Sequence, residues 1–176
     1  MKRIGRALLC LALFLVMLII LAPKANLYYL AEKQLAPQGV VIDGEALSDR
    51  GFGLEIGHAT LYAQQIESAS AERIVVDLFG LYNRVVAEKV TFSKPLQKFW
   101  PAEVNRAEVS YALWDPMHVI IDAEGDFGSL KGVISLADRT VTARLEPSQL
   151  MLTRFRATLR QLKKDETGGY RYESRF

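Results

Sequence analysis

The chain has 176 residues, half of them hydrophobic, and its 22 Lys and Arg against 20 Asp and Glu give a formal net charge of +2. Because Lys2, Arg3 and Arg6 stand at the amino terminus, the remaining chain holds 19 basic and 20 acidic residues, a balance that argues against a nucleic-acid partner. Cys10 is the single cysteine, which excludes a disulfide framework and a thiolate zinc site.

An apolar run from Ala7 to Ala22 contains no charge, amide, glycine or proline. Extended back to Ile4, it predicts a helix of about 28 Å, close to the ~30 Å hydrocarbon thickness of a bilayer. A buried core helix is the alternative, but such a helix would carry some polar face. The basic residues before the run predict an amino end in the cytoplasm and a carboxyl-terminal part that crosses the membrane.

The residues after the apolar run make a poor cleavage site. A cut after Ala22 would place Ile20 where signal peptidase prefers a small residue, and would place Pro23 directly after the bond. We therefore favour a retained signal anchor over a cleaved signal peptide. Residues 1–23 are expected to form the basic flank and the transmembrane anchor, and residues 24–176 a periplasmic domain of a single-pass inner-membrane protein.

A short helix is expected directly after the anchor. Asn26 is a suitable N-cap for residues 27–36, LYYLAEKQLA, and Pro37 would end the helix. Tyr28 and Tyr29 suit either the membrane interface or packing on the domain that follows, and the sequence leaves both readings open.

Strand follows strand from Val40 to Leu145. The runs are short, rich in β-branched and aromatic residues, and mostly bounded by Gly, Pro, Asn or Asp. No helical period interrupts them, so the short links predict an antiparallel meander. The predicted strands cover residues 40–42, 54–63, 73–78, 84–92, 103–113, 118–127, 130–136 and 140–145.

Alternation is clearest between residues 117 and 147. Val119, Ile121 and Ala123 point to one side and Asp122 and Glu124 to the other. Ile120 is the one apolar residue on the polar side of this alternation. The apolar side continues in a second and third strand around a turn at residues 137–139, through Leu130, Gly132, Ile134, Leu136, Val141, Ala143 and Leu145. A sheet with one such apolar face must fold over on itself, pair with a helix, or receive an apolar ligand.

Two segments are candidate contact regions for a membrane or a protein partner. The loop at residues 93–101, SKPLQKFWP, carries Phe99 and Trp100, which either plug the core or reach an interface. After Pro147, Ser148 is expected to cap an amphipathic helix through Lys164, with an apolar stripe at Leu152, Phe155, Leu159 and Leu162. Its other positions carry five basic residues and no acid: Arg154, Arg156, Arg160, Lys163 and Lys164.

This basic edge contrasts with residues 24–147, which hold 12 basic and 17 acidic side chains. The edge is either a solvated face of a helix that covers the sheet or a surface for anionic headgroups or an acidic partner. Gly168 and Gly169 then turn the chain into a closing strand at residues 170–176.

Catalytic motifs are absent from the sequence. It has no nucleophile elbow, phosphate-binding loop, zinc-protease motif or dinucleotide fingerprint. Asp122, Glu124 and Asp126 could in principle hold calcium, but side chains at this spacing splay along a strand. His58 and His118 are isolated imidazoles. We therefore expect neither an enzyme nor a bound cofactor or metal.

The stretches GFGLEIGHATLYAQQIESASAERIVVDLFGLYNRVVAEKVTF and GDFGSLKGVISLADRTVTARLEPS resemble the periplasmic sheet of the N-component family of type II secretion systems. More distantly, the chain is similar to AsmA-type proteins. The resemblance covers residues 26–176 in the order of elements, and it rests on short Gly-Asp-Phe-Gly and Ala-x-x-apolar patterns. It implies a curved, groove-forming antiparallel sheet without catalytic residues, accessory to secretion in the first family and bridge-like or lipid-handling in the second.

The combined prediction is a mainly β protein in which a transmembrane helix precedes a curved antiparallel meander, with a short amino-terminal helix and a carboxyl-terminal amphipathic helix. The expected function is a scaffold within an envelope assembly, by resemblance an accessory of type II secretion. The alternative is a lipid-handling groove. A scaffold would fill the apolar face with its own side chains, whereas a carrier would leave it open.

Overall fold

The computed structural model describes residues 10–11, 13–14, 16–17, 21, 23–165 and 168–176. No helix among these residues is long and apolar enough to cross a membrane. The predicted anchor at residues 7–22 includes residues 7–9, 12, 15, 18–20 and 22, which lie outside the described residues, as does its basic flank.

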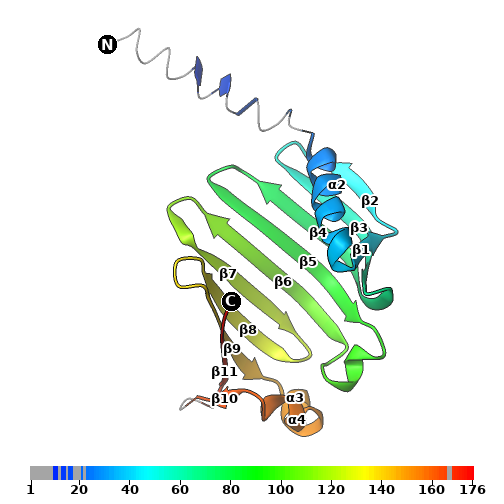
Figure 1. Cartoon of the computed structure of the whole chain (residues 1–176), viewed down its shortest axis with the longest axis vertical. Helices are drawn as coiled ribbons and strands as arrows, with labels where there is room; N and C mark the ends of the chain where they lie inside the picture. The colour runs from blue at the N-terminus through cyan, green and yellow to red at the C-terminus, as the bar shows by residue number, and fades with distance from the viewer. Residues whose placement is uncertain (1–9, 12, 15, 18–20, 22, 166–167) are drawn as a thin grey trace.

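In the described part of the chain, eleven strands form one antiparallel sheet (Figure 1). Its order is β1-β3-β4-β5-β6-β7-β8-β9-β11-β10, and β2 pairs with β3 beside β1. From β3 to β9 each strand pairs with the next one along the chain, so the predicted antiparallel meander is confirmed. The strands are β1 (Val40–Asp43), β2 (Ala46–Asp49), β3 (Gly53–Ala63), β4 (Ile66–Leu78), β5 (Tyr82–Phe92), β6 (Glu103–Ala112), β7 (Asp115–Gly125), β8 (Gly128–Ser135), β9 (Thr140–Pro147), β10 (Lys163–Lys164) and β11 (Tyr170–Arg175).

All eight predicted strands of the meander exist, and two of them differ from the prediction by three residues or more at their start. The strand predicted at residues 73–78 begins at Ile66, because Ala69 and Ala71 are buried positions on the same strand although small residues carry little strand signal. The strand predicted at residues 118–127 covers Asp115–Gly125 instead. The short strands β2 and β10 were not predicted.

The alternation of inward-facing and outward-facing side chains shifts by one residue at neighbouring positions of β3, β4, β5 and β6. Ile56 and Ala59, three residues apart, belong to one apolar cluster, and Val104 and Ala107 repeat this spacing in another. His58 has a φ of 56°, and the β6–β7 register shifts between Val104 and Arg106. This row of irregularities bends the sheet, as β-bulges do.

Helix α2 (Lys24–Leu35) confirms the predicted short helix but begins earlier than expected. Its N-cap is Pro23, so Asn26 lies inside the helix and does not cap it. The start is fixed by Lys24, a buried residue whose Nζ lies 3.6 Å from Asp49 Oδ1. Tyr28 packs against the cluster of Leu54, Ile56 and Ala59, which favours packing on the domain over a membrane interface for this tyrosine.

The predicted helix from Ser148 to Lys164 is correct at its start and wrong at its end. The Ser148 hydroxyl accepts a hydrogen bond from the Met151 amide at 3.2 Å and caps α3 (Gln149–Arg154). Phe155 then leaves helical geometry, and the four-residue α4 (Arg156–Leu159) follows. Because the helix stops there, Lys163 and Lys164 can pair with the closing strand β11, which the sequence predicted.

The sheet has two ends that differ in their neighbours. The turns β2/β3, β4/β5, β6/β7 and β8/β9 lie at one end, here called the α2-start end, because Lys24 pairs with Asp49 there. The turns β3/β4, β5/β6 and β7/β8 lie at the other end, where α3 and α4 are found, here called the α3–α4 end (Figure 1).

Candidate functional site: the concave face

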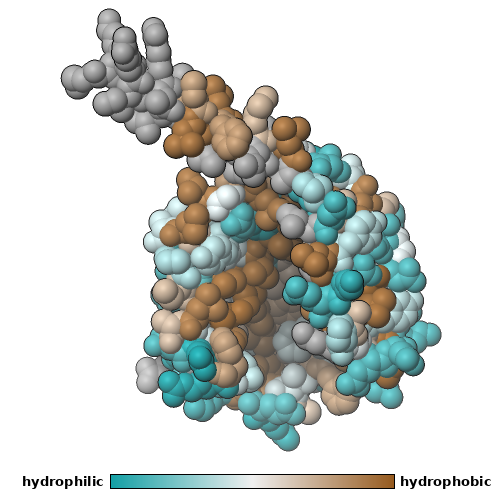
Figure 2. Space-filling view, turned by 45° about the horizontal axis from the view of Figure 1, so that its top comes forward, coloured by the Kyte–Doolittle hydropathy of each residue, from teal (hydrophilic) through white to brown (hydrophobic). Residues whose placement is uncertain are grey.

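The sheet is hollowed on the face that carries its apolar side chains. Figure 2 shows this hollow as a hydrophobic surface between hydrophilic rims. The pairing register places three neighbouring rows of side chains on it. One row is Ala87, Ala107, Ala123, Leu130 and Leu145, the next is Val85, Val109, Ile121, Gly132 and Ala143, and the third is Tyr111, Val119, Ile134 and Val141.

Packing covers this face at two places. Next to α2, the cluster of Leu54, Ile56 and Ala59 is buried. At the α3–α4 end a larger cluster forms around Phe127 and Met151, which are 2% and 0% exposed, with Val104, Leu145 and Leu159. The helices that supply these cores therefore cover the two sides of the face.

Between the two cores the apolar face stays open. Val85 and Val109 pair across β5 and β6, and each is 40% exposed. The neighbouring row begins with three alanines, which lowers the floor of the hollow because a methyl group rises little above the sheet. Val85 and Val109 are the exposed members of their own row, whereas Ile121 and Ala143 are half-buried and Gly132 is buried.

A cavity of about 300 Å³ continues this face beneath the carboxyl-terminal segment. Trp100 forms one wall and packs on Phe127, with ring centroids 5.5 Å apart. The remaining lining is mostly apolar, from Leu130, Ala143, Leu145, Thr158, Gln161, Leu162, Tyr170 and Tyr172.

The five predicted basic contact residues do not share one helix. All are exposed, but Arg154 ends α3, Arg156 begins α4, Arg160 follows α4, and Lys163 and Lys164 form β10. The structure still brings three of them together. Arg156, Arg160 and Lys164 line a second cavity of about 410 Å³, whose other lining is Leu152, Leu159, Leu162 and Tyr170.

The two cavities adjoin, since Leu162 and Tyr170 line both. A largely apolar compartment therefore lies beside one that combines apolar side chains with three positive charges. This arrangement suits a molecule with an apolar chain and an anionic head.

Phe99 and Trp100 take separate roles. Trp100 plugs the core at the α3–α4 end, which was one of the two predicted alternatives. Phe99 is 66% exposed, and its carbonyl accepts a hydrogen bond from Thr158 Oγ1 at 2.7 Å. That bond ties the loop to α4.

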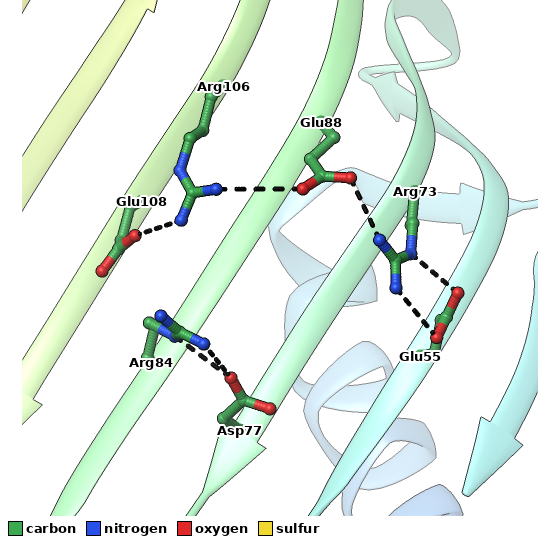
Figure 3. A network of polar contacts seen from close by, with 7 residues as sticks. All are labelled: Glu55, Arg73, Asp77, Arg84, Glu88, Arg106 and Glu108. Atoms are coloured by element: carbon green, nitrogen blue, oxygen red, sulfur yellow. Dashed lines mark hydrogen bonds and ion pairs between the residues drawn. The ribbon is translucent and has the colours of Figure 1, made fainter. Parts of the chain in front are cut away.

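The convex face is covered by a chain of ion pairs (Figure 3). Arg73 Nε lies 2.7 Å from Glu55 Oε1, and Arg73 Nη1 lies 3.3 Å from Glu88 Oε2. Arg106 continues the chain, 3.9 Å from Glu88 and 2.7 Å from Glu108. From Glu55 on β3 to Arg106 on β6, opposite charges thus stand on neighbouring strands, which is the favourable cross-strand arrangement, while Glu108 lies on the same strand as Arg106.

The contact between Arg73 and Glu55 shifts the pKa of both groups. The hydrogen bond from Arg73 lowers the pKa of Glu55, and the same bond raises the pKa of Arg73. Val75 and Val86 lie between the charged residues along their strands and are only 8% and 3% exposed. We infer that the aliphatic stems of the flanking side chains cover them.

The two histidines of the chain lie on separate strands. His118 Nδ1 lies 2.7 Å from Asp115 Oδ1, while His58 lies on β3, with β4, β5 and β6 between the two strands. Among the described residues, no group of three or more His, Cys, Asp or Glu side chains is placed to hold a metal ion.

Sequence reasoning placed Ala123 on the apolar side, as the structure does, but did not identify Ala87 and Ala107. The signal that aligns these three alanines is the register across β5, β6 and β7. Compared with models of protein families, with curated proteins and with solved structures, the chain matches none of them.

Proposed function

We propose that this protein is a membrane-anchored groove that binds an amphiphile with an apolar chain and an anionic head. The concave face holds the chain, and Arg156, Arg160 and Lys164 bind the head. The observation that carries this proposal is the apolar floor between the two cores, with Val85 and Val109 each 40% exposed. The role is non-enzymatic and needs no cofactor.

The proposal includes the predicted anchor and compartment. The run Ala7–Ala22 spans the inner membrane, and residues 24–176 lie in the periplasm, as the basic flank Lys2, Arg3 and Arg6 favours. Intact mass of the purified protein should show a mature chain that begins at or near Met1. A mature amino terminus at Pro23 or later would contradict the anchor.

The first experiment asks whether the hollow holds a lipid. The full chain is purified in detergent, and bound molecules are extracted and identified by mass spectrometry. Ala143→Trp should fill the cavity of about 300 Å³ and abolish lipid recovery. Thr142→Trp is the matched control, because residue 142 is adjacent in sequence and pairs on the convex face with Val133. Equal recovery from both variants, or none from the wild type, would contradict the groove.

The second experiment tests the charge of the head. Reversing Arg156, Arg160 and Lys164 to Glu should lower recovery of anionic lipid by some hundredfold, since each charge near an anionic group is worth up to about 1 kcal/mol. Reversing Lys33, Lys94 and Lys98, which are also exposed, is the control with the same change in net charge. If the two triple variants retain the same lipid, the head does not bind at this cavity.

A scaffold role in an envelope assembly, by resemblance in type II secretion, is the second candidate. The observation that favours it is the edge of the sheet. The strand β10 covers only Tyr170 and Arg171 of β11, so residues 172–175 present an edge to which a partner strand can add. Photocrosslinkers placed along these four residues in cells would capture a protein partner if the scaffold reading holds, and lipid capture at the concave face separates the two functions.

A further inference from the structure

The turns at the α2-start end carry a row of exposed apolar side chains. Leu81 and Trp114 are the most exposed of these turn residues, at 65% and 71%. They belong to the turns β4/β5 and β6/β7, and further members come from the turns on either side. The row consists of Phe52, Phe79, Leu81, Leu113, Trp114 and Leu136, and Phe176 continues it after β11.

Contacts between neighbouring turns hold this row in place. Phe52 and Phe79 stack with ring centroids 5.8 Å apart, and Trp114 stacks on Tyr82 at 6.0 Å. The Leu113 amide donates to the Leu81 carbonyl at 2.8 Å, which joins two turns through their backbones. The row is therefore a built surface and not a set of independent loop tips.

The position of the row identifies its partner. Lys24 Nζ lies 3.6 Å from Asp49 Oδ1, and Asp49 immediately precedes the turn that contains Phe52. The apolar run of the proposed anchor ends at Ala22, two residues before Lys24, which is at most about 7 Å of extended chain. The outer surface of the bilayer thus lies at the α2-start end. The Trp, Phe and Leu content of the row is typical of side chains that enter a membrane interface.

We propose that this row inserts into the interface of the same bilayer that holds the anchor, so that the open hollow begins at the membrane surface. A second contact of this kind fixes the orientation of the sheet relative to the membrane, because a single anchor would leave the sheet free to rotate about it. The inference goes beyond the groove function. It rests on the proposed anchor and not on the identity of the ligand.

The two tryptophans of the chain allow a direct test. In the Trp100→Phe variant, Trp114 is the sole tryptophan and reports on the row. The matched control combines Trp100→Phe and Trp114→Phe with Phe99→Trp, because Phe99 is 66% exposed and lies at the α3–α4 end. Both full-length variants are reconstituted in phosphatidylcholine vesicles with brominated acyl chains and in vesicles without bromine, and circular dichroism verifies their fold.

Bromine should lower the emission of Trp114 at least about twofold and leave the control within about a tenth of its value, as expected for an interfacial and a distant residue. Equal emission of Trp114 in both vesicles would overturn the proposal, and so would equal quenching of the control. As a second readout, Leu81→Cys in a Cys10→Ser chain carries a polarity-sensitive fluorophore, whose emission should shift to the blue in vesicles. Lipid recovery from the hollow is measured separately. Failure of the row to insert into the membrane can therefore be told apart from failure of the hollow to bind lipid.

Discussion

The two faces of the sheet are built from the same strands but differ in how their apolar side chains are covered. On the convex face, charged side chains pair from strand to strand, and the valines between them are buried. On the concave face, helices bury the apolar side chains at two places and leave the middle exposed. On the convex face charged neighbours cover Val75 and Val86, although Ile120 is 38% exposed, whereas in the described part of the chain the middle of the concave face has no such cover over Val85 and Val109.

The largest effect is expected from a comparison within the concave face. Met151 is fully buried, so Met151→Ala should lower the free energy of unfolding by about 2–5 kcal/mol. Val109→Ala, at the exposed floor, should cost no more than about 1 kcal/mol. Urea unfolding of the full chain in detergent measures both. Equal losses would mean that the floor is as tightly packed as the core at the α3–α4 end.

The next comparison places the same charge on each face of the β8–β9 hairpin. Ile134 faces the hollow beside Val141, so Ile134→Asp should cost about 1–3 kcal/mol. Thr142→Asp on the convex face should stay within about 1 kcal/mol, because an exposed carboxylate keeps its water. Urea unfolding of the full chain in detergent measures the loss of unfolding free energy in both variants. A reversed order would show that the two faces have been interchanged.

Adjacent valines on β5 sharpen the contrast between the faces. Val86 on the polar face is 3% exposed, and Val85 on the apolar face is 40% exposed. Val86→Ala should therefore cost about 1–2 kcal/mol and Val85→Ala roughly half as much or less. If Val85→Ala were the more damaging substitution, the hollow would be closed.

The smallest effect concerns pH and the ion pairs of the convex face. Because Arg73 lowers the pKa of Glu55, the stabilisation by this carboxylate is fully present above its unfolded pKa of about 4.3 and is lost as the pH falls through the lower folded value. The difference in urea midpoint between the wild type and Glu55→Gln should be constant above about pH 5 and shrink in more acidic buffer. A difference that grows on acidification would contradict the assigned partner.

Much of the fold could be predicted because strand signals are local. The alternation at residues 117–147 set the hairpin register, and Leu130 pairs with Leu145 as its pattern requires. The end of the carboxyl-terminal helix could not be predicted in this way. Residues 156–164 retain the helical stripe, but pairing of Lys163 and Lys164 with β11 is a tertiary contact that overrides local preference.

The candidate site was less visible in the sequence than the fold. The five basic residues were identified, but their grouping depends on the break at Phe155, which leaves Arg156, Arg160 and Lys164 around one cavity. The hollow itself depends on the irregular positions at His58 and Asn105. Because the alternation of side chains shifts by one residue there, the apolar residues before and after these positions lie on the same face of the sheet. No single strand carries that information.

The central claim, that the concave face holds an apolar chain, is tested most directly at two adjacent residues of β6. Val109 points into the hollow, and Ser110 points to the convex face, where it pairs with Arg84 and Ile120. A photoreactive benzophenone amino acid is placed at either position in the full chain, the cells are irradiated, and the purified protein is analysed by mass spectrometry. Lipid adducts should form at position 109 and be absent at position 110. Adducts at both positions, or at neither, would contradict the claim.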